Sequence, residues 1–340
     1  MDPGNPRCIP GWTTDPPHTS LDPLELTPPR ANDPSLGADR IPIHASVSFR
    51  HSGWASRRRH VYASLQRIKA STSRLSAFQH CGERAWILRS RTEPNTYRVA
   101  ASYCHDRFCQ PCARAKAFRL AANIRDNIGT RRHRFVTLTL KQSNQPLANI
   151  LDRLLHCFRL LRRSPRLRHC WQGGCAIVEV KRGQDRRFWN CHLHVIVNGT
   201  FLPHETLREE WKRITGDSFI VDVRRINEHA DAARYVCKYV AKPIDSTAFT
   251  QHDWIDELLH ATQRRRLLQT FGNWTGKPLN AMKSNPDDWQ PLCTFEEAIR
   301  QARHGHPTYQ HILNTIAKSW RGERDDHGNP LTPPFPVRGP

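Results

Sequence analysis

The sequence predicts an α+β fold in which an antiparallel sheet follows a small cysteine-rich module. Between residues 131 and 226, short segments of alternating apolar residues are separated by two helical patterns. Cysteines gather between residues 80 and 118, and the 340-residue chain is long enough for about two domains. The predicted order is β-α-β-β-α-β and then a helix, which is typical of a ferredoxin-like sheet with helices on one face.

Composition sets the predicted boundaries. Residues 1–45 are rich in Pro, Asp and Thr without apolar periodicity, so we expect a disordered tail. Apolar residues between positions 57 and 78 recur at helical spacing and predict one basic amphipathic helix. This helix lies within a basic helical segment at 46–79. The parts predicted after it are the cysteine-rich module at 80–125, the sheet domain at 130–245, a partly helical region at 246–320 and a disordered tail at 321–340.

The elements of the sheet domain follow from periodicity. Residues 134–140 predict a strand that alternates Val136, Leu138 and Leu140 with Phe135, Thr137 and Thr139. The other elements are a helix at 147–163, two strands at 175–183 and 188–199 joined by a turn, a helix at 203–216 whose glycine fits its end, and a strand at 219–226.

The charge of the chain points to a polyanionic partner. The formal net charge is +21, and nucleic acid is the commonest partner of such a basic protein. No apolar run approaches the roughly 20 residues that span a bilayer, and the N-terminus lacks a signal-peptide core. We therefore expect a cytoplasmic protein without a membrane partner, in which clustered cysteines indicate metal binding rather than disulfides.

The segment CHLHVIV predicts a metal site. His192 and His194 lie two apart on a strand and therefore share a face. An isolated pair of this kind is also compatible with a solvated sheet surface. A turn near residue 185 brings Glu179 of the preceding strand opposite residues 190–192, where it could be the third ligand. Two histidines and one carboxylate suit Mg²⁺ or Mn²⁺ near a phosphate, although zinc tolerates the same ligands.

The segment ARYVCKYVAKP, residues 233–243, predicts a helix with a chemically unusual face. Tyr235, Lys238, Tyr239 and Lys242 fall in one stripe, because residues three and four apart are neighbours on a helix. A phenol with an ordinary pKa of about 10 attacks phosphorus poorly unless nearby cations lower that pKa. The two lysines and a divalent ion could supply this activation, and the product would be a phosphotyrosine. Packing or base-stacking tyrosines are the alternative.

Together, FVTLTL, CHLHVIV and YVCKYVAK resemble the three motifs of the HUH endonuclease superfamily, in the order found in rolling-circle replication initiators. The Tyr-x-x-Lys-Tyr form is similar to initiators of small single-stranded DNA phages and to two-tyrosine transposases. The resemblance covers roughly residues 80–245. It implies a metal-dependent nickase that cuts and rejoins single-stranded origin DNA, on a small replicon such as a plasmid. Tyr239 aligns with the single nucleophile of one-tyrosine relatives.

The cysteine-rich module belongs to the same resemblance, since similar segments precede the catalytic domain in such initiators and transposases. The Cys-x2-Cys spacing of Cys109 and Cys112 indicates a structural zinc site. Cys81 and Cys104 would complete the tetrahedron, with the neighbouring His80 and His105 as alternatives.

Two other functions fit the same residues. A two-tyrosine transposase would use the same chemistry, and a zinc-containing DNA-binding regulator would bind DNA without forming a covalent adduct. For the initiator, the expected partners are single-stranded and origin DNA, with host helicase and polymerase as further candidates.

Overall fold

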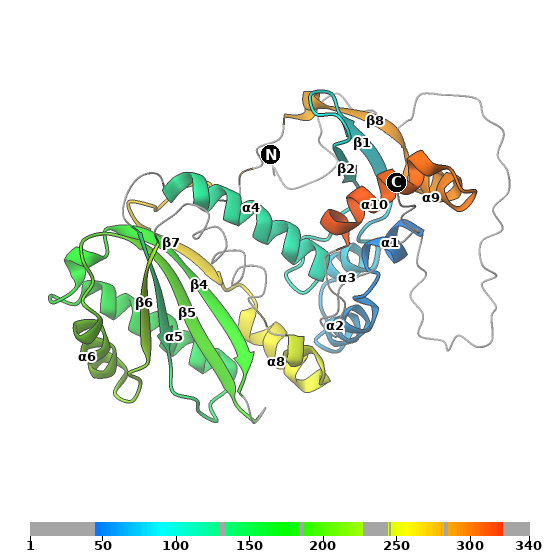
Figure 1. Cartoon of the computed structure of the whole chain (residues 1–340). Coiled ribbons are helices and arrows are strands. Elements are labelled where there is room, and N and C mark those ends of the chain that lie inside the picture. Colours follow the sequence, from blue (N-terminus) through cyan, green and yellow to red (C-terminus); the bar gives the residue numbers. More distant parts are fainter. Residues whose placement is uncertain are drawn as a thin grey trace.

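The computed structural model describes residues 45–128, 133–183, 187–226, 244, 246–279, 281 and 285–321. Figure 1 shows a large sheet at the lower left, a small sheet at the upper right, and the long helix α4 (Gln110–Ile128) between them. The predicted disordered tails lie almost entirely outside the described residues, so their disorder stays a prediction.

The large sheet confirms the predicted α+β class. Its strands pair antiparallel in the order β6-β3-β5-β4-β7. The first four have the order of a ferredoxin-like β-α-β-β-α-β unit, and β7 extends the sheet beside β4. The strands are β3 (His133–Thr139), β4 (Gly173–Arg182), β5 (Trp189–Asn198), β6 (Val221–Ile226) and β7 (Leu268–Gly272).

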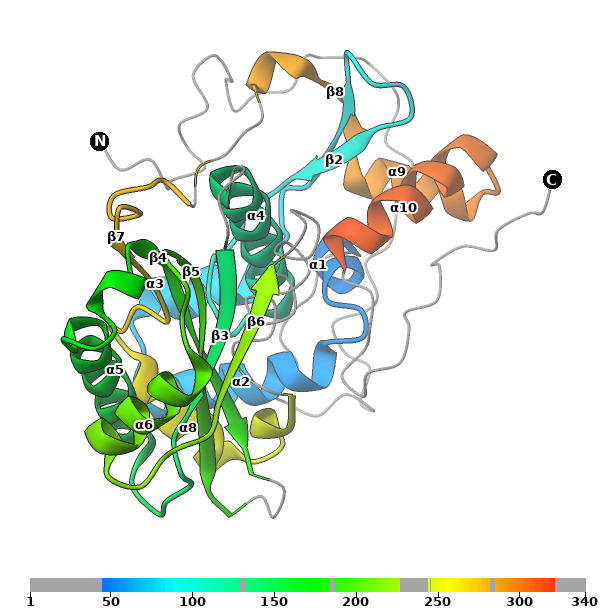
Figure 2. The same cartoon turned by 60° about the vertical axis from the view of Figure 1, so that its left-hand side comes forward.

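Helices α5 (Leu147–Arg163), α6 (His204–Thr215) and α8 (His252–Thr262) pack against one face of this sheet. Figure 2 shows α5 and α6 side by side along that face. Alternation places Leu138 and Leu193 in the same buried cluster as these helices. The opposite face carries the alternate side chains of each strand, and these include both histidines of the predicted metal site.

Helix α4 packs on that opposite face. Its residues Leu120 and Ile124 form a buried cluster with Phe135, Ile177 and Ile196 of three neighbouring strands. Helices therefore cover both faces of the sheet, whereas the sequence predicted helices on one face. The apolar part of the second face is covered by α4, which comes from the cysteine-rich module.

The prediction of a single amphipathic helix over residues 57–78 is wrong. The chain forms α1 (Ala45–Arg50), α2 (Ala55–Arg67) and α3 (Thr72–Gln79). Lys69 has a φ of 52°, which ends α2, and the Ser71 side chain accepts a hydrogen bond from the Arg74 backbone N–H at the start of α3. A capping serine thus starts a second helix where periodicity alone suggested a continuous one.

A second sheet joins distant parts of the sequence. It contains β1 (Trp86–Ser90), β2 (Tyr97–Ala100) and β8 (Trp289–Thr294), in the order β2-β1-β8. Helices α9 (Phe295–Arg303) and α10 (Pro307–Trp320) cover it, with Ile87, Phe295 and Trp320 in one buried cluster. The region 246–320, expected to be partly helical, therefore also contributes β7 and β8.

Glu210 of α6 forms a hydrogen bond with Ser164 at the end of α5. Its buried carboxylate accepts hydrogen bonds from Arg213 Nη2 at 2.9 Å and from Ser164 Oγ at 2.7 Å. The hydrogen bonds from Arg213 lower the pKa of Glu210 to about 2, against the opposing effect of burial and with help from Ser164 and Arg166.

We expect Glu210→Gln to lower the free energy of unfolding at pH 7 by about 1–3 kcal/mol, because a charged acceptor is lost. The pKa of Glu210 is about 2 in the folded protein and 4.5 in the unfolded chain. The ionised carboxylate therefore stabilises the fold fully above about pH 4.5, and this stabilisation is lost as the pH falls toward 2. Urea unfolding at pH 7 and at pH 3 measures both effects. A difference between variant and wild type that is as large at pH 3 as at pH 7 would contradict this account.

Candidate active site and cysteine cluster

The predicted metal ligands lie on one face of the large sheet. In the antiparallel register, Thr139, His192 and Glu179 form one row across β3, β5 and β4. Thr137 and His194 lie in the next row. The hairpin register expected from a turn near residue 185 is therefore present, and Glu179 lies directly opposite His192.

Hydrogen bonds orient both imidazoles. Thr137 Oγ1 lies 3.2 Å from His194 Nδ1, and Thr139 Oγ1 lies 3.0 Å from His192 Nδ1. His194 Nε2 lies 2.9 Å from Glu179 Oε2. Metal-binding histidines commonly use one ring nitrogen for such a supporting contact and the other for the ion. Sequence alternation put both threonines on one face, but their pairing with the histidines depends on the β3–β5 register.

The protonation of the site also suits a cation. Burial lowers the pKa of His192 to about 4, so its ring is neutral near pH 7. Burial alone would raise the pKa of Glu179, but hydrogen bonds from His194 and Lys181 outweigh it and keep this pKa below its usual value. A neutral imidazole and an ionised carboxylate are the forms that bind metal ions.

Two of the three donors lie close together. His194 Nε2 and Glu179 Oε2 are 2.9 Å apart, which is the length of their hydrogen bond and is also close to the roughly 3.0 Å between neighbouring ligands of an octahedral ion. The ring of His192 is centred 6.1 Å from that of His194. The residue types suit a divalent ion, but the donor atoms of the three side chains do not all lie within 4.8 Å of one another, and the ring of His192 would have to turn to bind an ion with the other two.

Tyr235, Lys238, Tyr239 and Lys242 lie outside the described residues. The described chain resumes at Ile244, which forms a parallel bridge with Val180 of β4. Val180 lies between Glu179 and Lys181, so the residue that follows the tyrosine segment lies beside the part of β4 that carries Glu179, on the edge away from β5.

The four predicted zinc ligands form a compact cluster. Cys81, Cys104, Cys109 and Cys112 are, among the described residues, the only group of three or more potential ligands whose donor atoms all lie within 4.8 Å of one another. The distances from Cys112 Sγ are 3.5 Å to Cys81 Sγ and 3.7 Å to Cys104 Sγ. A tetrahedral zinc ion with bonds of about 2.3 Å requires sulfur atoms about 3.8 Å apart. The cluster therefore has the dimensions of a structural zinc site.

The structure separates the cysteines from the two alternative histidine ligands. His80 Nδ1 lies 2.7 Å from a carboxylate oxygen of Glu83, and His105 is exposed and outside the group. Of the other cysteines in the described residues, Cys157, Cys170, Cys175 and Cys191 are buried singly in the cores, while Cys293 is half-buried.

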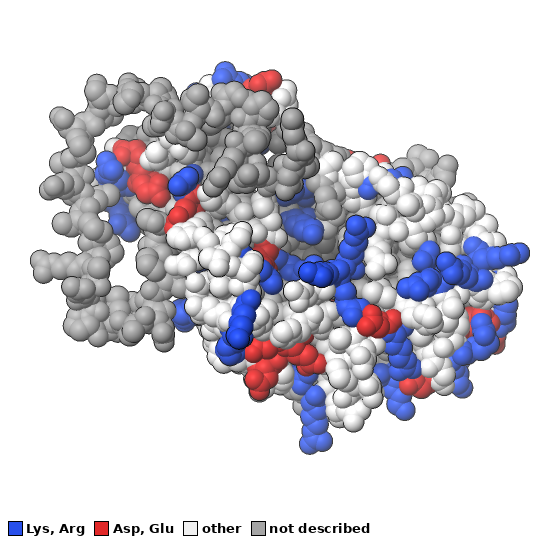
Figure 3. All heavy atoms as spheres, turned by 180° about the vertical axis from the view of Figure 1, so that it is seen from behind, with Lys and Arg blue, Asp and Glu red and all other residues white. Residues whose placement is uncertain are grey.

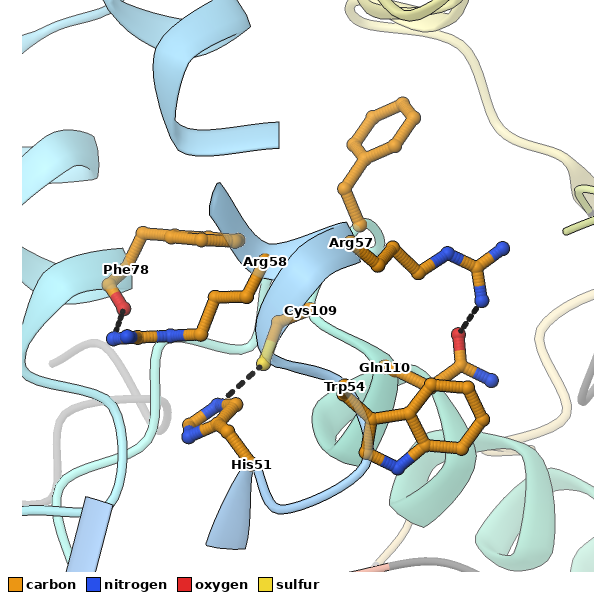
Figure 4. Close-up of a pocket in the computed structure, with 8 residues that line it drawn as sticks. His51, Trp54, Arg57, Arg58, Phe78, Cys109 and Gln110 are labelled. Atoms are coloured by element: carbon orange, nitrogen blue, oxygen red, sulfur yellow. Dashed lines mark hydrogen bonds between the residues drawn. The ribbon is translucent and has the colours of Figure 1, made fainter. Parts of the chain in front are cut away.

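Basic side chains surround the cluster, and sequence reasoning missed them. Arg50 Nη2 donates to Cys112 Sγ at 3.4 Å, and His51 Nε2 lies 3.5 Å from Cys109 Sγ. Arg58 donates to the carbonyl of Phe78 (Figure 4) and to that of Gln79, just before Cys81. Four thiolates around Zn²⁺ carry a net charge of about −2, so the two arginines reduce the cost of burying such a site.

The surface of the protein is strongly basic. Figure 3 shows Lys and Arg side chains spread over the face opposite to that of Figure 1, with fewer acidic side chains among them. In the part of the chain that the structure describes, no helix is long and apolar enough to cross a membrane.

We expect loss of the cysteine cluster to unfold the N-terminal helices together with the start of α4. Structural zinc sites contribute about 10–16 kcal/mol of binding free energy to folding. Cys109→Ser with Cys112→Ser should lose bound zinc and a large part of the thermal stability, whereas Cys157→Ser, away from the cluster, should keep its zinc. Elemental analysis and thermal unfolding check this, and purified wild-type protein without about one zinc per chain would refute it.

The comparisons with known proteins give one match. A family model described as Replication protein matches residues 97–319, well over half of the chain. No curated protein and no solved structure matches. The match supports a replication initiator of the rolling-circle type, and such an initiator binds DNA. The chain belongs to the Replication protein family.

Proposed function

We propose that this replication protein is an HUH endonuclease that nicks and rejoins single-stranded DNA at a replication origin. The observation that carries the proposal is the row of Thr139, His192 and Glu179, with His194 Nε2 at 2.9 Å from the Glu179 carboxylate. A carboxylate and a histidine buried on one sheet face cost free energy even when they are hydrogen-bonded, and a ligand-binding role would explain their presence.

In this proposal His192, His194 and Glu179 hold Mg²⁺ or Mn²⁺. The bound ion supplies Lewis-acid polarisation of the scissile phosphate. Thr137 and Thr139 keep the imidazole rings oriented, and the partly buried environment of His192 keeps its ring nitrogen unprotonated. The zinc cluster has a structural role at the start of α4.

The proposed nucleophiles are Tyr239 and Tyr235. Attack of the phenol oxygen on phosphorus forms a 5′-phosphotyrosine ester, breaks the bond to the 3′ oxygen, and leaves a 3′-hydroxyl that takes up the phenolic proton. Attack by a 3′-hydroxyl reverses the exchange and reseals the strand without ATP. Lys238 and Lys242 lower the pKa of the phenols.

Chain connectivity supports a role for Tyr239. Four residues separate it from Ile244, which bridges Val180 beside Glu179. The five Cα-to-Cα steps from Tyr239 to Ile244 span at most about 18 Å of fully extended chain. This limit allows the phenol to reach the proposed phosphate site.

The family match favours replication over transposition. A plasmid or similar small replicon, a cytoplasmic location, and host helicase and polymerase as partners belong to the same proposal. A non-catalytic DNA-binding regulator would also carry zinc and basic charge. Formation of a covalent DNA adduct distinguishes the enzyme from such a regulator.

We expect His192→Ala and His194→Ala to reduce cleavage of single-stranded origin DNA by about 100-fold or more, because the ion acts in the transition state. DNA affinity should change little, since phosphate attraction comes from many basic side chains. Denaturing electrophoresis and filter binding measure the two effects. His169→Ala, an exposed position at the far end of the sheet, is the matched control. Retained cleavage in the double variant His192→Ala with His194→Ala would remove the metal site from the mechanism.

If both tyrosines are nucleophiles, Tyr235→Phe and Tyr239→Phe should each still form a covalent DNA adduct, and the double variant should form none. Residues four apart on a helix can act at one phosphate. We expect Tyr239→Phe to lose more adduct, since Tyr239 aligns with the single nucleophile of one-tyrosine initiators. Peptide mapping of each adduct identifies the residue used. Complete loss of adduct in Tyr239→Phe would reduce Tyr235 to a supporting role.

A further inference from the structure

Lys181 lies in the candidate active site without a role in the proposed chemistry. It follows Glu179 by two residues on β4, and alternation therefore places both side chains on the face that carries the histidines. Its Nζ lies 2.9 Å from Glu179 Oε2. The Lys181 side chain is 37% exposed whereas that of Glu179 is 6% exposed, so the ammonium lies between the buried carboxylate and solvent.

One carboxylate oxygen serves two partners. Glu179 Oε2 is the atom that lies 2.9 Å from His194 Nε2 and also 2.9 Å from Lys181 Nζ. A divalent ion bound by Glu179 would be placed close to this ammonium. Like charges about 4 Å apart repel by several kcal/mol at the effective dielectric of a protein surface. The ammonium and the ion therefore compete for Glu179.

A second acceptor lies next to Lys181. Asn190 is its cross-strand partner in the β4–β5 register. The buried Asn190 Oδ1 has no hydrogen-bond partner within the described part of the chain. Directly opposed side chains on neighbouring strands have Cβ atoms about 5 Å apart, so the long lysine side chain can leave Glu179 and stay at the edge of the same site.

We propose that Lys181 is a phosphate-binding catalytic residue that also balances the charge of Glu179 before the substrate arrives. In the free protein its ammonium neutralises the carboxylate. A divalent ion held by Glu179 would release the ammonium, which would then contact a non-bridging oxygen of the scissile phosphate and stabilise the charge that gathers there. This inference rests on the proposed function, since it assigns Lys181 to the same ion and phosphate.

The proposal predicts opposite effects on two measurements. Lys181→Met removes the competing charge, so Mn²⁺ should bind the DNA-free protein about three- to tenfold more tightly. The same variant lacks a donor to the phosphate, so single-turnover cleavage at saturating Mn²⁺ should fall about tenfold or more. A residue that merely keeps Glu179 in place would weaken both properties when removed.

Electron paramagnetic resonance of free Mn²⁺ gives the affinity, and rapid-quench assays on labelled single-stranded origin DNA give the rate. Lys212→Met, which removes the same charge from an exposed position on α6, should leave both values unchanged. Lys181→Gln, which keeps a polar side chain, should behave as Lys181→Met, and thermal unfolding of all three variants establishes that they fold.

Unchanged or weaker Mn²⁺ binding in Lys181→Met and Lys181→Gln would overturn the competition for Glu179. Tighter binding with an unchanged cleavage rate would overturn the phosphate contact. Failure of the wild-type protein to form any covalent DNA adduct would refute the proposed nickase and the phosphate contact with it. Because the Mn²⁺ affinities are measured without DNA, they would still decide whether Lys181 competes for Glu179.

Discussion

The register of β5 between β3 and β4 is the constraint on which the candidate site depends. It brings threonine, histidine and glutamate from three strands into adjacent rows on one face. A slip of one residue would turn every side chain of β5 to the opposite face, exchanging His192 and His194 for Leu193 and Val195. The apolar set on the other face, buried under α5 and α6, makes such a slip costly. Burial of the apolar face thus sets the register of β5, and this register decides which side chains lie together on the polar face.

Helix α4 connects the cysteine cluster to this site. It begins directly after Cys109 and contains Cys112 in its first turn, and its other end packs over Phe135. The ring of Phe135 stacks on His194 at 5.5 Å with an interplanar angle of 15°. The helices near the cysteines also share one buried cluster with the sheet, through Val61, Leu65 and Phe78. The cysteine-rich module therefore supports the sheet and is continuous with its core.

Local sequence patterns predicted much of the fold, and long-range pairings account for what they missed. Alternation located β3 to β6 within about two residues, and a short hairpin turn set Glu179 opposite His192. Cysteine spacing predicted the cluster that the structure brings together. Strand β8 was missed because it pairs with β1, about 200 residues earlier. The contacts of Thr137, Thr139 and Lys181 depend on register and side-chain reach, which no local pattern encodes. The tyrosines, predicted with the most chemical detail, lie outside the described residues.

The proposed cleavage chemistry depends most on whether His192, His194 and Glu179 bind one divalent ion together. Anomalous diffraction from crystals grown with Mn²⁺, recorded at the manganese absorption edge, tests this directly. We predict a single strong anomalous peak within about 2.3 Å of the two imidazole nitrogens and a Glu179 oxygen. Manganese bound elsewhere on the protein, with no peak between these three side chains, would contradict the central claim.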